Sequence, residues 1–289
     1  MEDGPTMGLR INNNIDAFNA HRNLAFNAIR LGKSMEKLSS GFRINRAADD
    51  AAGLGISERM RGQIRGIEQA QRNAYDGISF VQAAEGSMTE LHDILHRVRE
   101  LAVQFQNGTN DANAKMAITT EVAQLSAEMG RMISGANFNG VNLLDGSTAS
   151  ITLQVGANQT ASDQLSVALT DLSAMTSSGT GTSGGTLSAV MGNFNSGTMT
   201  NVLADVDSFV NQVSTARGQM GAVQNRLEHT VNALGIYQEN LMAAESRIRD
   251  VDMASEMSNY TRLQILQESG VAMLAQANQT QSAVLRLLG

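Results

Sequence analysis

The sequence predicts a mainly α-helical fold: an elongated antiparallel helical rod with terminal coiled-coil helices and a small β-hairpin region at its distal end. Three observations lead to this class. Long stretches place apolar residues alternately three and four apart, which is the spacing of a coiled-coil seam. The single proline among the 289 residues is Pro5, so no later residue carries a helix-breaking ring. A central segment rich in Ser, Thr and Gly interrupts the helical pattern.

The first part of the chain predicts three helices. The first covers roughly residues 9–38, and its inward side contains Leu24, Ala28, Leu31, Met35 and Leu38. The second begins near Met60 and ends with the apolar series Leu91, Ile94, Val98, Leu101 and Phe105. Residues 107–111 have the sequence Asn-Gly-Thr-Asn-Asp, which predicts the end of the second helix, a turn and the N-cap of a third helix. A third helix follows, with Ile118, Val122, Leu125, Met129 and Met132 inward.

The centre of the chain has a different pattern. Asn139-Gly140 and Asp145-Gly146 are turn pairs, and Ile151, Leu153 and Val155 alternate as in a half-buried strand. Residues 173–200 include 18 Ser, Thr or Gly residues among 28, a composition typical of surface loops. We therefore expect hairpins and loops inserted at the distal turn of the rod.

The strongest periodicity lies after this segment. From Val206 to Ile248, apolar residues keep the three-four spacing with Thr230 as the only polar exception, and such a helix would be roughly 64 Å long. The same spacing returns near the C-terminus at Leu263, Leu266, Gly270, Met273, Ala277, Thr280, Val284 and Leu287. Both ends of the chain are thus expected to be amphipathic helices that bury one another.

Composition and charge exclude several classes of protein. No apolar run approaches the ~18 residues of a membrane-spanning helix, so no membrane insertion is expected. The absence of cysteine excludes disulfides and thiolate metal sites. The net charge of −7 argues against nucleic-acid binding. The segment from Leu9 to Arg46 is nevertheless basic, because it contains seven basic and two acidic residues. We interpret those cations as partners of carboxylates.

Signals for enzymatic activity are weak. His92-Asp93-Ile94-Leu95-His96 imitates the H-E-x-x-H zinc helix, but Asp93 is a carbon shorter than the usual general base. His21 and His229 fall in other predicted helices, and Gly53-Leu54-Gly55 does not complete a dinucleotide-binding motif. We therefore predict no catalytic residues, no metal site and no cofactor.

Several blocks resemble those of bacterial flagellins, in the order of that family. They are Leu9-Arg10-Ile11-Asn12-Asn13-Asn14, Leu38-Ser39-Ser40-Gly41-Phe42-Arg43-Ile44-Asn45, Ala47-Ala48-Asp49-Asp50-Ala51-Ala52-Gly53, Val98-Arg99-Glu100-Leu101-Ala102-Val103-Gln104, Asn225-Arg226-Leu227-Glu228-His229-Thr230, Ala244-Glu245-Ser246-Arg247-Ile248-Arg249-Asp250 and Met273-Leu274-Ala275-Gln276-Ala277-Asn278-Gln279. Two departures are Gln281, where the family usually has proline, and residues 1–6, which precede the usual start.

The resemblance implies a structural subunit, not an enzyme, that polymerises into the flagellar filament used for swimming. Such subunits are secreted unfolded through the flagellar export channel and assembled at the tip, outside the cell. The implied partners are many copies of the same chain, an export chaperone, the filament cap and hook-junction proteins. A hook–filament junction protein is the alternative function, and a subunit with an inserted peptidase is a weaker one.

The resemblance also divides the chain into domains. It implies an N-terminal extension at 1–7, an inner domain of paired terminal helices at 8–40 plus 253–289, a rod domain at 41–137 plus 201–252, and a variable region at 138–200. The expected inner coiled-coil interface consists of Leu24, Leu31, Met35, Leu38, Leu263, Leu266, Met273, Val284 and Leu287.

A host partner follows from the resemblance as well. In flagellins sensed by the innate immune flagellin receptor, contacts cluster on the R-V-R-E-L helix and its neighbour. Carried over by position, the contact residues are Arg97, Leu101 and Glu121. Arg97 and Leu101 are four apart and share one helical face. Leu125 stands where strongly recognised members carry Arg.

Overall fold

The computed structural model describes residues 13–173, 190, 194 and 202–288, with side chains to residue 280. The predicted extension at 1–7 and most of the Ser/Thr/Gly-rich segment lie outside these described residues. Within them the protein is mainly helical, with two small antiparallel pairs of strands, so the predicted class is confirmed.

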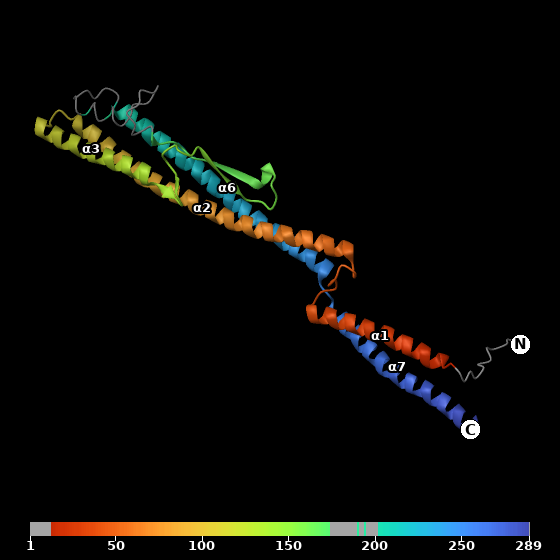
Figure 1. The fold of residues 1–289 in the computed structure, drawn as a ribbon. Coiled ribbons are helices and arrows are strands. Elements are labelled where there is room, and N and C mark those ends of the chain that lie inside the picture. Colours follow the sequence, from red (N-terminus) through yellow and green to blue (C-terminus); the bar gives the residue numbers. More distant parts are fainter. Residues whose placement is uncertain (1–12, 174–189, 191–193, 195–201, 289) are drawn as a thin grey trace. The chain divides into compact units, whose positions relative to one another are not determined.

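Five long helices make up the described chain (Figure 1). They are α1 (Ile15–Ser40), α2 (Ala51–Phe105), α3 (Ala112–Gly135), α6 (Val202–Arg249) and α7 (Met253–Leu288). Several of them start at side-chain caps. The Asn14 carboxamide oxygen accepts from the Ala17 N–H at 2.9 Å, and the Asp111 carboxylate accepts from the Ala114 N–H at 2.7 Å. The second of these caps lies in the predicted turn.

Helix α2 begins at Ala51, earlier than the expected start near Met60. Its first turn is stabilised by Asp50, whose carboxylate accepts from the Gly53 N–H at 2.9 Å. The early turns are rich in Ala and Gly and lack an apolar period, so their sequence does not signal a helix.

The two hairpins occur where the central pattern predicts them. Strands β1 (Asn137–Phe138) and β2 (Val141–Asn142) flank Asn139-Gly140, where both residues have positive φ, 51° and 82°. This is the conformation that favours Asn-Gly in a tight hairpin turn. Strand β3 (Ser150–Gln154) pairs with β4 (Gln164–Ala168), across the 3-10 turn η1 (Ala161–Asp163).

The chain divides into two compact units. Unit 1 contains residues 1–62 and 241–289, and unit 2 contains residues 63–240. These limits fall inside α2 and α6, whereas the domain limits implied by resemblance lie near residues 40 and 253. The implied division into inner and rod domains therefore stays a prediction.

Unit 2 holds the large apolar core. Helices α2, α3 and α6 share one buried cluster with the hairpins, and it includes fully buried Met88, Leu95 and Met129. Three side-chain contacts fix the antiparallel alignment of α2 and α6: Arg99–Asp207 at 2.7 Å, Arg217–Glu85 at 3.7 Å and Gln238–Glu68 at 3.2 Å.

The predicted seam of α6 is confirmed over most of its length and is interrupted at Tyr237. Val206, Phe209, Val213, Ala216, Met220, Leu227 and Leu234 are buried. Tyr237, the next expected seam residue, is instead 66% exposed. Gln238 takes its place and donates a hydrogen bond to Glu68. The expectation for Tyr237 was therefore wrong, since a polar pair replaces the apolar step.

Candidate functional site

The candidate functional site is the pair of terminal helices in unit 1, α1 and α7, which run side by side (Figure 1). Two hydrogen bonds far apart in sequence set their direction. The Asn14 side chain donates to the Ala277 carbonyl oxygen at 3.1 Å, and the Ser34 hydroxyl donates to the Glu256 carboxylate. Because the start of α1 meets the end of α7, the two helices are antiparallel.

The least exposed residues of both helices follow the three-four spacing of a coiled-coil seam. On α1 they are Ala17, Ala20, Leu24, Asn27, Leu31, Ser34 and Leu38; on α7 they are Glu256, Tyr260, Leu263, Gln267, Gly270, Leu274 and Ala277. Several of these positions are polar. Among the described residues of α1 and α7, only Ser34 and Leu263 are fully buried. The pair is thus thinly packed.

One contact brings the two helices particularly close. A Cβ built on Gly270 would lie 3.2 Å from the Leu24 Cδ1 atom, which is tighter than an ordinary van der Waals contact. A glycine in a helix interior lowers stability by about 1 kcal/mol relative to alanine. At this position that cost is offset by the closer approach of α1.

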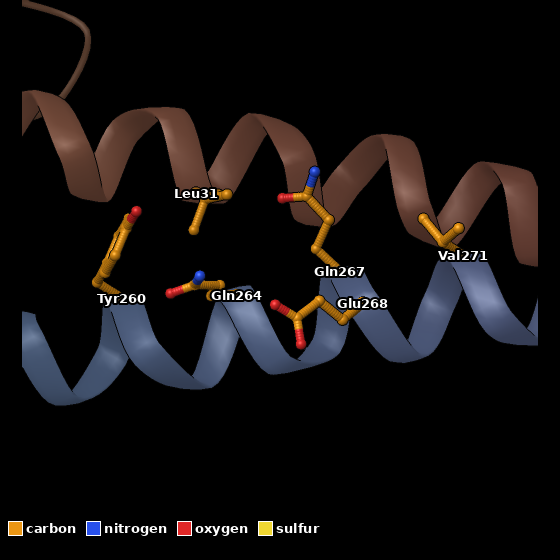
Figure 2. A pocket seen from close by; sticks show the side chains of 6 residues that line it. All are labelled: Leu31, Tyr260, Gln264, Gln267, Glu268 and Val271. Carbon is orange, nitrogen blue, oxygen red and sulfur yellow. The ribbon is translucent and has the colours of Figure 1, made fainter.

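Figure 2 shows a shallow pocket along the same seam. Its lining residues are Leu31, Tyr260, Gln264, Gln267, Glu268 and Val271. Only Leu31 comes from α1, and three of the other side chains are amides or a carboxylate. The seam is therefore not a continuous apolar strip.

The predicted inner interface coincides only in part with this seam. Leu24, Leu31, Leu38 and Leu263 lie on it. Met35, Leu266 and Met273 lie outside it and are 53%, 44% and 61% exposed. In α7 the seam passes through Gln267 and Leu274, one residue later than expected. The side chains of Val284 and Leu287 lie outside the described residues.

Helix α1 carries a second apolar stripe that the pair leaves exposed. Ile15, Phe18, Phe26 and Ile29 are 50% to 70% exposed. At 100° per residue they fall within an arc of roughly 80°, and that arc lies opposite the seam. We call these four residues the outer stripe of α1.

Helix α7 also exposes large apolar side chains. They are Met253, Met257, Ile265, Leu266, Val271 and Met273. Exposed apolar side chains that gather on one side of an element, as in the outer stripe of α1, mark interaction sites in soluble proteins. Pairing of α1 with α7 therefore covers one side of each helix. Other apolar side chains of both helices stay exposed among the described residues.

A short junction in unit 1 ties the segment after α1 to the segment between α6 and α7. Phe42 and Asp250 form an isolated antiparallel bridge. The Arg43 N–H donates to the Arg249 carbonyl oxygen at 2.6 Å, and the Val251 N–H donates to the Gly41 carbonyl oxygen at 3.0 Å. We call this set of contacts the junction.

Arg249 is the central side chain of the junction. Its guanidinium donates to the Glu58 carboxylate at 2.7 Å and lies 4.8 Å from the centre of the Phe42 ring. The hydrogen bond from Arg249, with a further contribution from Arg61, lowers the pKa of Glu58 below its usual range. The ionised form of Glu58 therefore favours its contact with Arg249.

The residues carried over as receptor contacts do not form one exposed surface. Arg97 donates from Nε to the Glu121 carboxylate at 2.9 Å and from NH1 to the Glu100 carboxylate at 3.1 Å, and it stays accessible. Leu101 is only 1% exposed and belongs to the core of unit 2. In the single chain Leu101 therefore does not add to the accessible surface around Arg97, because its side of α2 packs inward.

The described residues hold no cluster of three or more His, Cys, Asp or Glu side chains suited to a metal ion. No helix in the described ranges combines the length and apolar character needed to cross a bilayer.

The fold and the site define a class: a helical chain whose ends pair with one another and still expose apolar stripes. Two family models match most of its length. The model described as the bacterial flagellin N-terminal helical region matches residues 11–149, and the model of the bacterial flagellin C-terminal helical region matches residues 203–288. The chain belongs to the bacterial flagellin family.

Individual relatives agree with this family. A flagellin from Halalkalibacterium halodurans is 49% identical over 278 residues, covering 96% of this chain and 99% of that protein. A flagellar filament 33 kDa core protein from Treponema phagedenis is 46% identical over 288 residues, with coverage of 96% and 99%. A solved structure assigned to a flagellar hook-associated protein from Vibrio parahaemolyticus has a TM-score of 0.60, covers 70% of this chain and 100% of its own, and is 13% identical, so it shows a shared fold alone.

Proposed function

We propose that this chain is the structural subunit of a bacterial flagellar filament, a helical polymer outside the cell, and that it has no enzymatic activity. The observation that carries the proposal is the exposed apolar surface of α1 and α7, above all the outer stripe of α1. In a polymer, further copies of the same helices would cover these stripes. Contacts between different surfaces of identical subunits do not close on themselves and so generate a helical filament.

The inner interface predicted from the sequence fits this proposal as an interface between copies. Met35, Leu266 and Met273 lie outside the α1–α7 seam, so their burial would have to come from neighbouring subunits. The seam itself would then hold each pair together while the exposed side chains pack between pairs. Val284 and Leu287 complete the proposed interface at the C-terminus.

The test compares two leucines three residues apart on α7. Leu266→Asp places a carboxylate on a side chain that is 44% exposed in the single chain, whereas Leu263→Asp places one at a position only 6% exposed. An unpaired charge is costly only where it is buried. We expect Leu266→Asp to abolish seeded polymerisation and leave the monomer's helical content unchanged.

Leu263→Asp serves as the matched variant, and we expect it to reduce both the helical content of the monomer and polymerisation. Electron microscopy and sedimentation measure the polymer, and circular dichroism measures the monomer. Filaments of normal length and yield from Leu266→Asp would contradict the proposal.

The family also suggests accessory partners: an export chaperone, the filament cap and hook-junction proteins. The hook–filament junction protein is not favoured as the chain's own function, because the relatives matched over nearly the full length are flagellins and a filament core protein. The likeness to a hook-associated structure concerns the fold alone.

We keep the innate immune flagellin receptor as a proposed host partner, with a revised surface. Arg97 and Glu121 remain accessible and paired, and they would provide the contact, whereas Leu101 would act only by supporting α2 from within. Arg97→Ala should lower signalling by monomers in receptor-expressing cells, and equal signalling by Arg97→Ala and the parent chain would argue against this surface.

A further inference from the structure

His92 and His96 lie one turn apart on α2, within unit 2, and the Nε2 atoms of their rings approach each other. Their Nε2 atoms are 2.9 Å apart, the ring centres are 4.5 Å apart, and the ring planes are nearly perpendicular at 83°. We propose that these two side chains form a binding site for one divalent late transition-metal ion, with Cu(II) and Ni(II) preferred over Zn(II). The site uses no residue of the paired terminal helices.

The distance between the two nitrogens fits ligands on one ion. Imidazole nitrogens bind such ions at about 2.0–2.1 Å. Two nitrogens at that distance stand about 2.9 Å apart when the angle at the metal is 90°, and about 3.3 Å apart at a tetrahedral angle. The observed 2.9 Å matches the right-angled arrangement. Tetragonal geometry with nitrogen and oxygen ligands is typical of Cu(II) and Ni(II), whereas Zn(II) favours a tetrahedron.

Burial decides which nitrogen of His92 is available. Its Nδ1 atom is buried and has no hydrogen-bond partner among the described residues. The Nε2 atom faces His96, whose side chain is exposed. An ion arriving from solvent would therefore meet two Nε2 atoms, and water would fill its other coordination positions.

The surroundings predict modest affinity. Glu100, one turn beyond His96, is engaged by Arg97 at 3.1 Å and does not supply a third ligand. The Nδ1 atom of His92 lacks the hydrogen-bond acceptor that usually orients a metal-binding histidine. Arg217 places a positive charge near His92, although Glu85 offsets part of it at 3.7 Å. Asp93, adjacent to His92 in sequence, contributes a favourable charge. We therefore expect micromolar rather than nanomolar dissociation constants.

The test is calorimetric titration of the full-length monomer, without an affinity tag, with Cu(II), Ni(II) and Zn(II) salts in a non-chelating buffer. The variants are His96→Gln, which removes one ligand at an exposed position, and His229→Gln, a matched exposed histidine on α6. Circular dichroism confirms that each variant is folded. The Cu(II) complex is also examined by electron paramagnetic resonance for coupling to two nitrogens.

The expected result is one ion per chain, with Ni(II) bound more tightly than Zn(II). His96→Gln should weaken Ni(II) binding at least tenfold, and His229→Gln should leave it unchanged. Equal affinities of the parent chain and His96→Gln, or tighter binding of Zn(II) than of Ni(II), would overturn the proposal. In that case the two histidines form a simple hydrogen-bonded pair.

Discussion

Gly270 shows how one missing side chain sets the spacing of two helices. The Leu24 side chain occupies the space that a Cβ at Gly270 would enter, at 3.2 Å. An alanine there would require Leu24 to move by a few tenths of an ångström and would gain helix propensity of about 1 kcal/mol. A leucine there cannot be accommodated without separating the helices.

We therefore expect Gly270→Leu to disrupt the α1–α7 pair and to prevent polymerisation, while Gly270→Ala keeps both. The matched control is Gly32→Leu on α1, where no atom lies within 4 Å of the added Cβ. Helical content and sedimentation after seeding provide the measurements. If Gly270→Leu assembles as well as Gly32→Leu, close approach at this position is not required.

At the scale of elements, the junction makes unit 1 sensitive to acid. The pKa of Glu58 is lowered in the folded chain, chiefly by its hydrogen bond from Arg249. A carboxylate with a lowered folded pKa stabilises the fold above its unfolded pKa, near about 4.3, and loses that contribution as the pH falls through the folded value. The pKa of Asp49 is also lowered, chiefly by a backbone hydrogen bond from Arg46 and further by one from Asn45.

This linkage predicts that the junction opens more readily as the pH falls below about 4.3 and through the lowered folded pKa of Glu58. Amide hydrogen exchange at Arg43 and Val251, whose N–H groups donate across the junction, provides the measurement, after correction for the intrinsic effect of pH on exchange. In Glu58→Gln the protection should be lower near neutral pH and should depend less on pH. Protection with the same pH dependence in both chains would rule out Glu58 as the titrating group.

Helix positions were largely predictable from the sequence, because apolar spacing and turn residues are local signals. The end of α2, the cap at Asp111 and the Asn139-Gly140 turn are examples. The start of α2 was not predictable, since its first turns lack an apolar period.

The phase of the seams was predicted less well. On α7, Leu266 and Met273 fit a three-four repeat as well as Gln267 and Leu274 do. The prediction chose Leu266 and Met273 because both are apolar, whereas the α1–α7 seam passes through Gln267 and Leu274. The contacts of Ser34 with Glu256 and of Leu24 with Gly270 select the observed phase. Such cross-helix contacts are invisible in a single sequence.

At the scale of the whole molecule, the two units differ in how much apolar surface they bury. Unit 2 contains nearly all of the buried apolar cluster, whereas α1 and α7 contribute one fully buried apolar side chain, Leu263, among their described residues. Local opening is easiest where few apolar contacts hold an element. The terminal helices should therefore open more readily than α2 and α3 in a single chain.

Limited proteolysis tests this difference. In monomers, a protease of broad specificity should cut within α1 and α7 before it cuts within α2 or α3, because cleavage requires local opening. Trypsin is unsuitable, since α7 offers it only Arg262 and Arg286. In filaments the same sites should become protected, since proposed neighbours would cover the exposed stripes. Leu266→Asp, held under polymerising conditions, should keep the monomer pattern. Mass spectrometry of timed digests locates the cuts, and early cleavage within residues 63–105 of α2 in the monomer would contradict the assignment of stability to unit 2.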